Sequence, residues 1–206
     1  SEEDKSRVRD QIGLNKELVG FYACGVFKKD SPEYGFWDLD NIKIINETMQ
    51  KTKEKIKADF GLVAKMHSRQ PDSDFDEINN YILGNSSGNI KLIPKNESVD
   101  VHQLILAADF SSTACSTVVI EAVLMGKPFI SLQPGLKTQD YLSIITKNEI
   151  VPVGYTEESC RGLVENIIAH KHMREVELPK LSSQFKTDGK ATERVTKLIY
   201  EMMNGN

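Results

Sequence analysis

The chain has 206 residues, of which 39% are hydrophobic and 27% charged, the balance of an ordinary globular protein. Its formal net charge is −4, and no block of lysine or arginine is long enough to form a footprint for nucleic acid. No apolar run approaches the ~18 residues that a membrane span needs. We therefore expect one compact domain over residues 1–206, with neither a nucleic-acid partner nor a membrane span.

The three cysteines, Cys24, Cys115 and Cys160, lie far apart in the sequence. A disulfide framework or a zinc site needs paired or clustered cysteines, so we expect free, buried thiols and a cytoplasmic location. Residue 1 is a serine and not a methionine, and we therefore expect the chain to be a segment of a longer protein.

The first half of the chain alternates short apolar runs with segments of helical periodicity. Residues 17–24 are rich in β-branched and aromatic side chains and predict a strand. Apolar residues then recur at helical spacing from Ile42 to Ile56, which predicts an amphipathic helix. The next predicted elements are a strand at residues 61–66, a helix at 74–83 and a strand at 90–93 that ends before Pro94.

The second half continues this alternation. Apolar spacing from Val101 to Ala108 predicts a helix with Asp100 as its N-cap. The remaining predicted elements are a short strand at 109–110, a polar loop at 111–117, a helix at 118–125 that stops at Gly126, a strand at 129–132, a helix near 139–146, a strand at 150–153, a helix after Thr156 and a last helix from Ala191 to Met202. About six strands separated by helices indicate an α/β fold, a doubly wound parallel sheet with helices on both faces.

The polar loop at residues 111–117 is the sharpest functional signal. In a doubly wound sheet, ligands bind beyond the carboxyl ends of the strands, where this loop follows a strand. The first amides of the helix after it are unpaired and carry a partial positive charge, which favours a phosphate. The hydroxyls available to donate to that phosphate are those of Ser112, Thr113, Ser116 and Thr117. The alternative is a plain serine–threonine loop that caps the helix without a ligand.

Glu121 stands in the otherwise apolar helix at residues 118–125. Its carboxylate needs hydrogen-bond donors, and it lies about one helical turn beyond Thr117. The two hydroxyls of a ribose next to a bound diphosphate would supply such donors. The alternative is a glutamate that faces solvent.

At these residues the sequence resembles the C-terminal domain of GT-B-fold enzymes. The resemblance lies in Ala108-Asp109, the small-residue loop after it, and the helix that bears Glu121 and ends in Gly126-Lys127-Pro128. The group includes glycosyltransferases, the non-hydrolysing UDP-N-acetylglucosamine 2-epimerases and the CDP-glycerol phosphotransferases. Relatives often have glycine in the loop, and this chain has none there. The resemblance implies a Rossmann-like sheet that forms one half of a two-domain protein.

The resemblance also implies roles for individual residues. Ser116 and Thr117 would hold the diphosphate of a nucleotide-sugar, with UDP the expected nucleotide, and Glu121 would accept hydrogen bonds from its ribose. The other implied contacts are Ile93 and Pro94 at the base, His67 and Arg69 at the phosphates or the sugar, and Gln133 and Gln139 at the donor sugar. For His67, the alternative is a structural histidine at a strand end.

The function implied by the resemblance is that of the donor-binding half of a glycosyltransferase. An N-terminal acceptor-binding domain or separate subunit would complete the site, and this half would be inactive alone. No metal or other cofactor is required in that scheme. The alternatives are an epimerase-like or CDP-glycerol phosphotransferase-like domain, a subunit of a split transferase, or a non-catalytic nucleotide-binding module.

Overall fold

The computed structural model describes residues 2–29, 31–85, 88–147, 150–170, 186 and 188–204. The chain divides into two compact units, Ser1–Val176 and Glu177–Asn206. The first unit contains the whole sheet and every residue singled out above as a candidate ligand contact. In the second unit the structure describes one helix, α9 (Ala191–Met203), where the sequence predicts the last helix.

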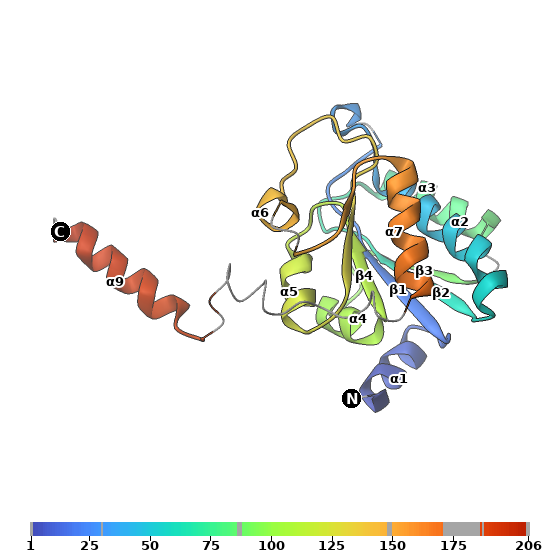
Figure 1. Ribbon diagram of the computed structural model, residues 1–206, viewed down its shortest axis with the longest axis horizontal. Helices are drawn as coiled ribbons and strands as arrows, with labels where there is room; N and C mark the ends of the chain where they lie inside the picture. Colours follow the sequence, from blue (N-terminus) through green and yellow to red (C-terminus); the bar gives the residue numbers. More distant parts are fainter. Residues whose placement is uncertain are drawn as a thin grey trace. The chain divides into compact units, whose positions relative to one another are not determined.

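The first unit is built on a six-stranded sheet in which every strand pair is parallel (Figure 1). The strands are β1 (Leu18–Ala23), β2 (Phe60–Lys65), β3 (Ile90–Ile93), β4 (Phe110–Thr113), β5 (Phe129–Leu132) and β6 (Val153–Gly154). Their order across the sheet is β3-β2-β1-β4-β5-β6. The chain therefore winds outward in both directions from the β1–β4 pair, and the predicted doubly wound fold is confirmed.

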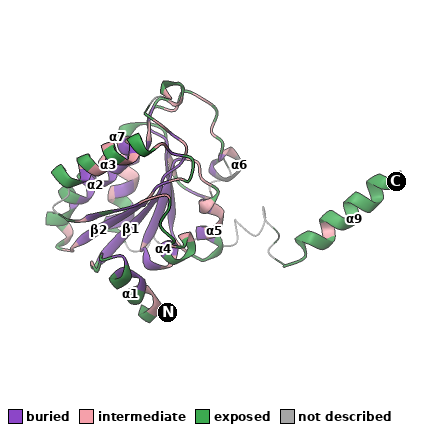
Figure 2. Ribbon diagram, turned by 180° about the vertical axis from the view of Figure 1, so that it is seen from behind, coloured by how far each residue is buried: buried purple, intermediate pink, exposed green. Residues whose placement is uncertain are grey.

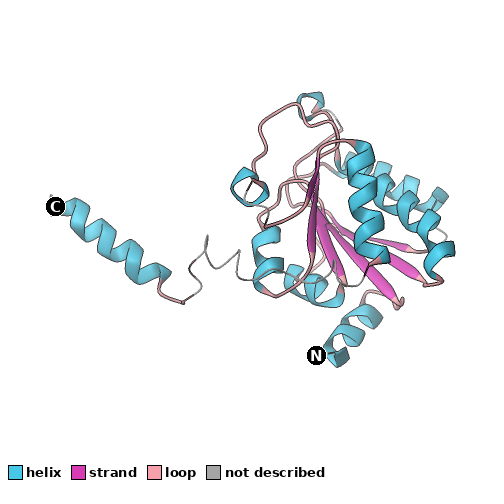
Figure 3. Cartoon of the chain, viewed as in Figure 1, coloured by secondary structure: helices cyan, strands magenta, loops and turns pink. Residues whose placement is uncertain are grey.

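Helices cover both faces of this sheet (Figures 1 and 3). One layer contains α2 (Asp38–Ile56), α3 (Asp72–Asn85) and α7 (Glu157–Ala169), and the other contains α4 (Val101–Ala107) and α5 (Val118–Leu124). The first helix, α1 (Glu2–Gln11), packs against α4. Two short helices, η1 (Pro32–Tyr34) and α6 (Ser143–Thr146), lie in connecting segments. None of the helices that the structure describes is long and apolar enough to cross a membrane.

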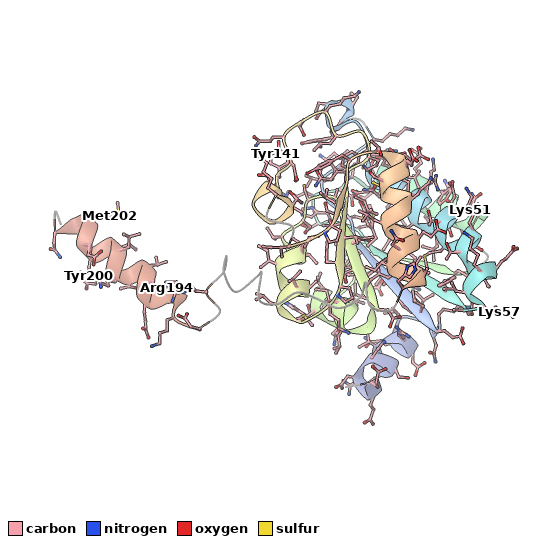
Figure 4. All side chains as sticks on the ribbon, in the orientation of Figure 1. Lys51, Lys57, Tyr141, Arg194, Tyr200 and Met202 are labelled. Atoms are coloured by element: carbon pink, nitrogen blue, oxygen red, sulfur yellow. The ribbon has the colours of Figure 1, made fainter. Side chains whose placement is uncertain are left out.

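The strands form the centre of the core, and Figure 2 shows them buried between the helices. All six residues of β1 are buried, because both faces of a central parallel strand are covered. The exterior of α2 is charged by contrast, and Figure 4 shows Lys51 and Lys57 projecting outward from the sheet unit. The helical period of α2 thus separates a face packed on the sheet from a solvated face.

The structure contains the predicted strands and helices, most with boundaries shifted by one or two residues and α2 beginning four residues earlier. The larger differences concern α1, β4, α6 and β6. The structure contains α1, for which the sequence analysis predicted no element. The strand predicted at residues 150–153 is the two-residue β6, which begins after Pro152, a residue without an amide hydrogen to donate. The helix predicted near 139–146 is reduced to α6, and β4 is longer than predicted.

Candidate functional site

The carboxyl ends of β1 and β4 meet at the point where the strand order reverses. Residues 24–37 leave the end of β1, and residues 114–117 leave the end of β4. Loops that diverge at such a point open a crevice at the edge of the sheet. This edge is the candidate site, and most of the residues selected from the sequence lie on or next to its loops.

The predicted loop at residues 111–117 is partly a strand. Ser111, Ser112 and Thr113 belong to β4 and are fully buried. The Ser112 hydroxyl donates to the Phe21 carbonyl at 3.1 Å, and the Thr113 hydroxyl donates to the Ala23 carbonyl at 2.8 Å. The loop prediction was wrong here because small hydroxyl side chains, which favour turns, can also satisfy themselves on the carbonyls of a neighbouring strand. The hydroxyl protons of Ser112 and Thr113 are already donated within the sheet, and we do not assign them to a ligand.

The loop that remains, residues 114–117, leads into α5. Ser116 caps this helix itself, because its hydroxyl accepts from the Val118 amide at 3.3 Å and its carbonyl accepts from the Val119 amide at 3.2 Å. The Ser116 amide donates to the Thr113 hydroxyl oxygen at 3.3 Å, and the Ile120 amide donates to the Thr117 carbonyl at 2.9 Å. Among the amides of 116–120, all of them in the described part of the chain, that of Thr117 alone has no acceptor. The amino-terminal end of α5 thus has fewer unpaired amides than the sequence predicts, although Thr117 is exposed.

Glu121 has a protein partner. Its Oε2 lies 3.1 Å from His102 Nε2, and His102 Nδ1 lies 3.1 Å from Asp100 Oδ1. The Asp100 carboxylate also caps α4 as predicted, by accepting from the His102 amide at 3.0 Å, and this bond lowers the pKa of Asp100. Only an imidazolium can donate from both ring nitrogens, so a neutral His102 donates to one of the two carboxylates. His102 is exposed, but it is in contact with the candidate ribose-binding carboxylate, a role that sequence reasoning missed.

His67 lies in the loop after β2 and its ring is held in one orientation. The Arg69 amide donates to His67 Nδ1 at 3.1 Å, and the His67 amide donates to Gln70 Oε1 at 3.0 Å. Partial burial, with the charge of Arg69, lowers the pKa of His67 below 6.5. At neutral pH the ring is therefore neutral and carries its proton on Nε2, from which it can donate. Arg69 itself is exposed.

Ile93 ends β3, and the loop after it begins at Pro94. The Ile93 side chain is fully buried, and its carbonyl accepts from the Met66 amide at 3.0 Å. The Pro94 carbonyl accepts from the Glu97 amide at 3.2 Å, which closes a turn. The edge that a nucleotide base could contact is therefore the half-buried Pro94 ring and the turn after it rather than the Ile93 side chain.

The two glutamines after β5 have different environments. Gln133 is buried, and its Nε2 donates to the Ser131 hydroxyl oxygen at 2.9 Å and to Asp140 Oδ1 at 3.0 Å, whereas Gln139 is exposed. Asp140 also accepts from the Leu142 amide, the Thr146 hydroxyl and the Tyr155 hydroxyl at 2.6–2.8 Å. Burial would raise the pKa of Asp140, but these hydroxyl and amide donors outweigh it and lower the pKa. Asp140 therefore organises the loop after β5, where Gln133 was expected to contact the donor sugar, and no distinctive motif marks Asp140 in the sequence.

A groove and a cysteine near the edge are not suited to bind the predicted nucleotide diphosphate. A groove of about 520 Å³ lies between α2, the loop after β5 and the start of α7, lined by Asp40, Lys43, Glu47, Pro134, Tyr155 and Arg161 among others. Arg161 is already paired with Glu47 at 2.7 Å and with Glu157 at 2.8 Å, and the carboxylates of the lining, Asp40, Glu47 and Glu157, outnumber its cations, Lys43 and Arg161. The groove therefore offers a diphosphate little positive charge. Cys115, half-buried at the edge, is a neutral thiol because burial raises its pKa to about 12.

The sequence matches no protein-family model and no curated protein. Solved structures do match its fold. A complex of S. aureus MnaA with UDP is similar at a TM-score of 0.64 and 22% identity, covering 97% of this chain and 48% of that one. A glycosyltransferase from Rickettsia africae is similar at 0.71 and 12%, covering 100% and 53%. The UDP-GlcNAc 2-epimerase from Methanocaldococcus jannaschii is similar at 0.58 and 17%, covering 95% and 49%.

At these identities the comparisons establish a shared fold. The chain spans about half the length of each of these proteins. The prediction that it has the fold of one half of a GT-B enzyme is confirmed at that level.

Proposed function

We propose that this chain is the nucleotide-sugar-binding half of a glycosyltransferase, and that it holds a UDP-linked donor at the carboxyl edge of β1, β3 and β4. The observation that carries the proposal is the position of Glu121, a half-exposed carboxylate one turn inside the helix that begins at this edge. The fold shared with a UDP-bound protein and with a glycosyltransferase supports it.

The diphosphate would lie against Thr117 and Ser116. The exposed Thr117 supplies an amide without an acceptor, a hydroxyl and the positive end of a short helix. His67 Nδ1 accepts from the Arg69 amide, so the ring proton lies on Nε2, which would donate to the same phosphates. These donors would stabilise the charge that develops on the departing diphosphate during sugar transfer. Arg69 would add a positive charge near it.

The ribose would replace His102 as the partner of Glu121. Two vicinal hydroxyls can both donate to one carboxylate, whereas the imidazole offers a single proton to it. The base would then extend toward Pro94 and the turn after β3. Gln139 is exposed in the loop after β5 and would contact the sugar, while Gln133 would support that loop through its hydrogen bond to Asp140.

Calorimetric titration of the chain with UDP, CDP and GDP tests the proposal. We expect UDP to bind, and Glu121→Gln to weaken it about tenfold because one charged acceptor of the ribose hydroxyls is lost. Thr117→Val, which removes a hydroxyl at the diphosphate, should also weaken UDP. Glu165→Gln is the matched control, because Glu165 is a half-exposed glutamate of α7 paired with Lys55. His102→Ala cannot serve as a control, since His102 contacts Glu121. UDP affinity that is unchanged in Glu121→Gln would overturn the site assignment.

A UDP-N-acetylglucosamine 2-epimerase is the second candidate, because one of the matching structures is such an enzyme. Epimerisation needs no acceptor, whereas sugar transfer does. Incubating the full-length parent protein with UDP-N-acetylglucosamine alone therefore distinguishes the two. An epimerised sugar nucleotide would support the second candidate, and an unchanged one would leave sugar transfer as the proposal.

A further inference from the structure

A buried carboxylate, Asp38, lies directly beneath the candidate site. It is the first residue of α2 and is fully buried. The Tyr22 hydroxyl donates to its Oδ1 at 2.7 Å and the Gly25 amide at 3.0 Å, while Gln70 Nε2 donates to its Oδ2 at 2.6 Å. The three donors come from β1, from the loop after β1 and from the loop after β2. One carboxylate thus joins the two loops that begin at the centre of the edge.

Gln70 connects Asp38 to the His67 loop. Its side chain is 1% exposed and uses both ends, since Nε2 donates to Asp38 and Oε1 accepts from the His67 amide at 3.0 Å. Its own carbonyl accepts from Lys95 Nζ at 3.2 Å, which ties the loop after β3 to the same group. An amide side chain can satisfy both neighbours in one orientation only, as long as Asp38 presents an unprotonated oxygen.

We propose that Asp38 is a positioning residue for the candidate site, which acts through Gln70 to hold the His67–Arg69 loop in place and releases that loop when it binds a proton. A proton taken from water onto Oδ2 turns this oxygen into a donor that faces the two N–H bonds of Gln70 Nε2. The Gln70 amide then turns over, and its Oε1 accepts from the new Asp38 O–H. Its NH₂ group now faces the His67 amide, so the hydrogen bond that anchors the loop is lost.

The surroundings of Asp38 place this change near neutral pH. Burial raises the pKa of Asp38 to about 7, against the lowering effect of the bonds from Tyr22 and Gly25. The other titratable groups that face it are Tyr22 and Cys24, Asp74 of α3, and Cys115 after β4. Burial raises the pKa of the phenol and of both thiols, so these three stay neutral, and the charge of Asp74 raises the pKa of Asp38 further. The loop is therefore held above about pH 7 and released below it.

The test follows the His67 amide proton and the Asp38 carboxyl carbon by NMR in the intact chain, from about pH 5 to about pH 9. We expect both signals to move with one midpoint near pH 7. The His67 ring nitrogens are recorded in the same spectra, because that ring titrates at lower pH and must be distinguished. Different midpoints for the two signals, or an immobile His67 amide, would overturn the proposal.

Two variants separate positioning from a structural role. Asp38→Asn imitates the protonated acid, so the His67 amide should keep its low-pH position throughout the range. Gln70→Met removes the hydrogen bonds that link Asp38 to His67 but leaves Asp38 free to titrate. The His67 amide signal should therefore no longer shift with the protonation of Asp38. In Gln70→Met, however, the unfolding equilibrium constant should still rise by roughly two to three orders of magnitude from pH 4 to pH 7, since a raised carboxyl pKa stabilises the fold only while protonated. Asp76→Asn, an exposed aspartate of α3, is the matched control and should behave as the wild type. A pH-dependent shift of the His67 amide with a midpoint near pH 7 that persists in Asp38→Asn would refute the proposal.

Ligand binding adds a further arm, which rests on the proposed function. UDP affinity should fall about fivefold below pH 7 in the wild type, in line with the loss of one ordered donor, and should show no such fall in Gln70→Met. If UDP does not bind at any pH, the proposed function fails while the NMR titration still decides the role of Asp38. If the His67 amide signal shifts near pH 7 but UDP affinity is equal above and below that pH, the His67 loop does not contact the nucleotide. Asp38 would then have no positioning role in the UDP site.

Discussion

Replacement of Arg9 by methionine should be among the most destabilising single changes in the chain. Arg9 is 7% exposed and makes three hydrogen bonds at the amino-terminal edge of the sheet. It donates to the Ala107 carbonyl at 2.8 Å, to the Lys16 carbonyl at 2.8 Å and to Asp109 Oδ2 at 2.7 Å. These bonds join α1 to the end of α4 and to the start of β4. The aspartate of the alanine–aspartate motif thus has a structural role, at the edge opposite the candidate site.

The magnitude follows from what methionine would leave unpaired. Two carbonyls would lose a donor, and Asp109 would keep only Lys5 and the Val19 amide, both at 2.7 Å. Breaking a buried ion pair typically costs about 3–5 kcal/mol, and because Lys5 still neutralises Asp109 we expect about 3 kcal/mol. Burial raises the pKa of Asp109, but Lys5, the Val19 amide and Arg9 lower it on balance, so its stabilising charge is lost only as the pH falls below about 4.

Urea denaturation followed by circular dichroism measures the free energy of unfolding at pH 7. Arg7→Met is the matched control, because Arg7 lies on the same helix but its side chain is 75% exposed and pairs only across the surface with Asp4. This control should change stability by less than about 0.5 kcal/mol. An Arg9→Met variant that lost no more than the control would refute the view that α1 is fixed to the sheet through Asp109.

Three further predictions concern packing and capping. Gly20→Ala should destabilise by about 1–3 kcal/mol in urea, because the new methyl would lie 2.7 Å from Cζ of Phe110 within the sheet. Gly162→Ala should instead stabilise by about 0.5–1 kcal/mol, since it adds a helix-favouring methyl to α7 with nothing within 4 Å, and destabilisation there would contradict the helix. Thr156→Ala should cost about 1 kcal/mol in the same assay by removing the hydroxyl that accepts from the Ser159 amide at 3.1 Å, and an unchanged midpoint would argue against this cap.

The sequence predicted the sheet well because periodicity and composition act locally. The strand predicted at residues 90–93 is β3 without correction, and β1 and β2 differ from their predictions by one residue at each end. The parallel pairing of the strands follows from the alternation of strand and helix, but their order does not, because β4 follows β3 in the chain and yet pairs with β1. The loop prediction for residues 111–113 was wrong because the hydroxyls of Ser112 and Thr113 donate to carbonyls of β1, about 90 positions earlier in the chain.

The candidate site was predictable in outline and not in its contacts. Thr117 and Glu121 could be selected together because helix spacing fixes their relation, but the His102 partner of Glu121 comes from another helix. Asp38 and Asp140 were missed for the same reason, since each accepts hydrogen bonds from residues on separate segments and neither stands in a distinctive motif. Networks of buried polar groups depend on tertiary contacts, which a single sequence does not reveal.

The most direct test of the central claim is to map the amide resonances of the chain as UDP is added. Binding at the β1–β4 edge predicts shifts at Thr117, at Glu121 and at His102, which the ribose would displace from Glu121. Shifts confined to the groove near Tyr155 and Arg161, with Thr117 and Glu121 unmoved, would contradict it.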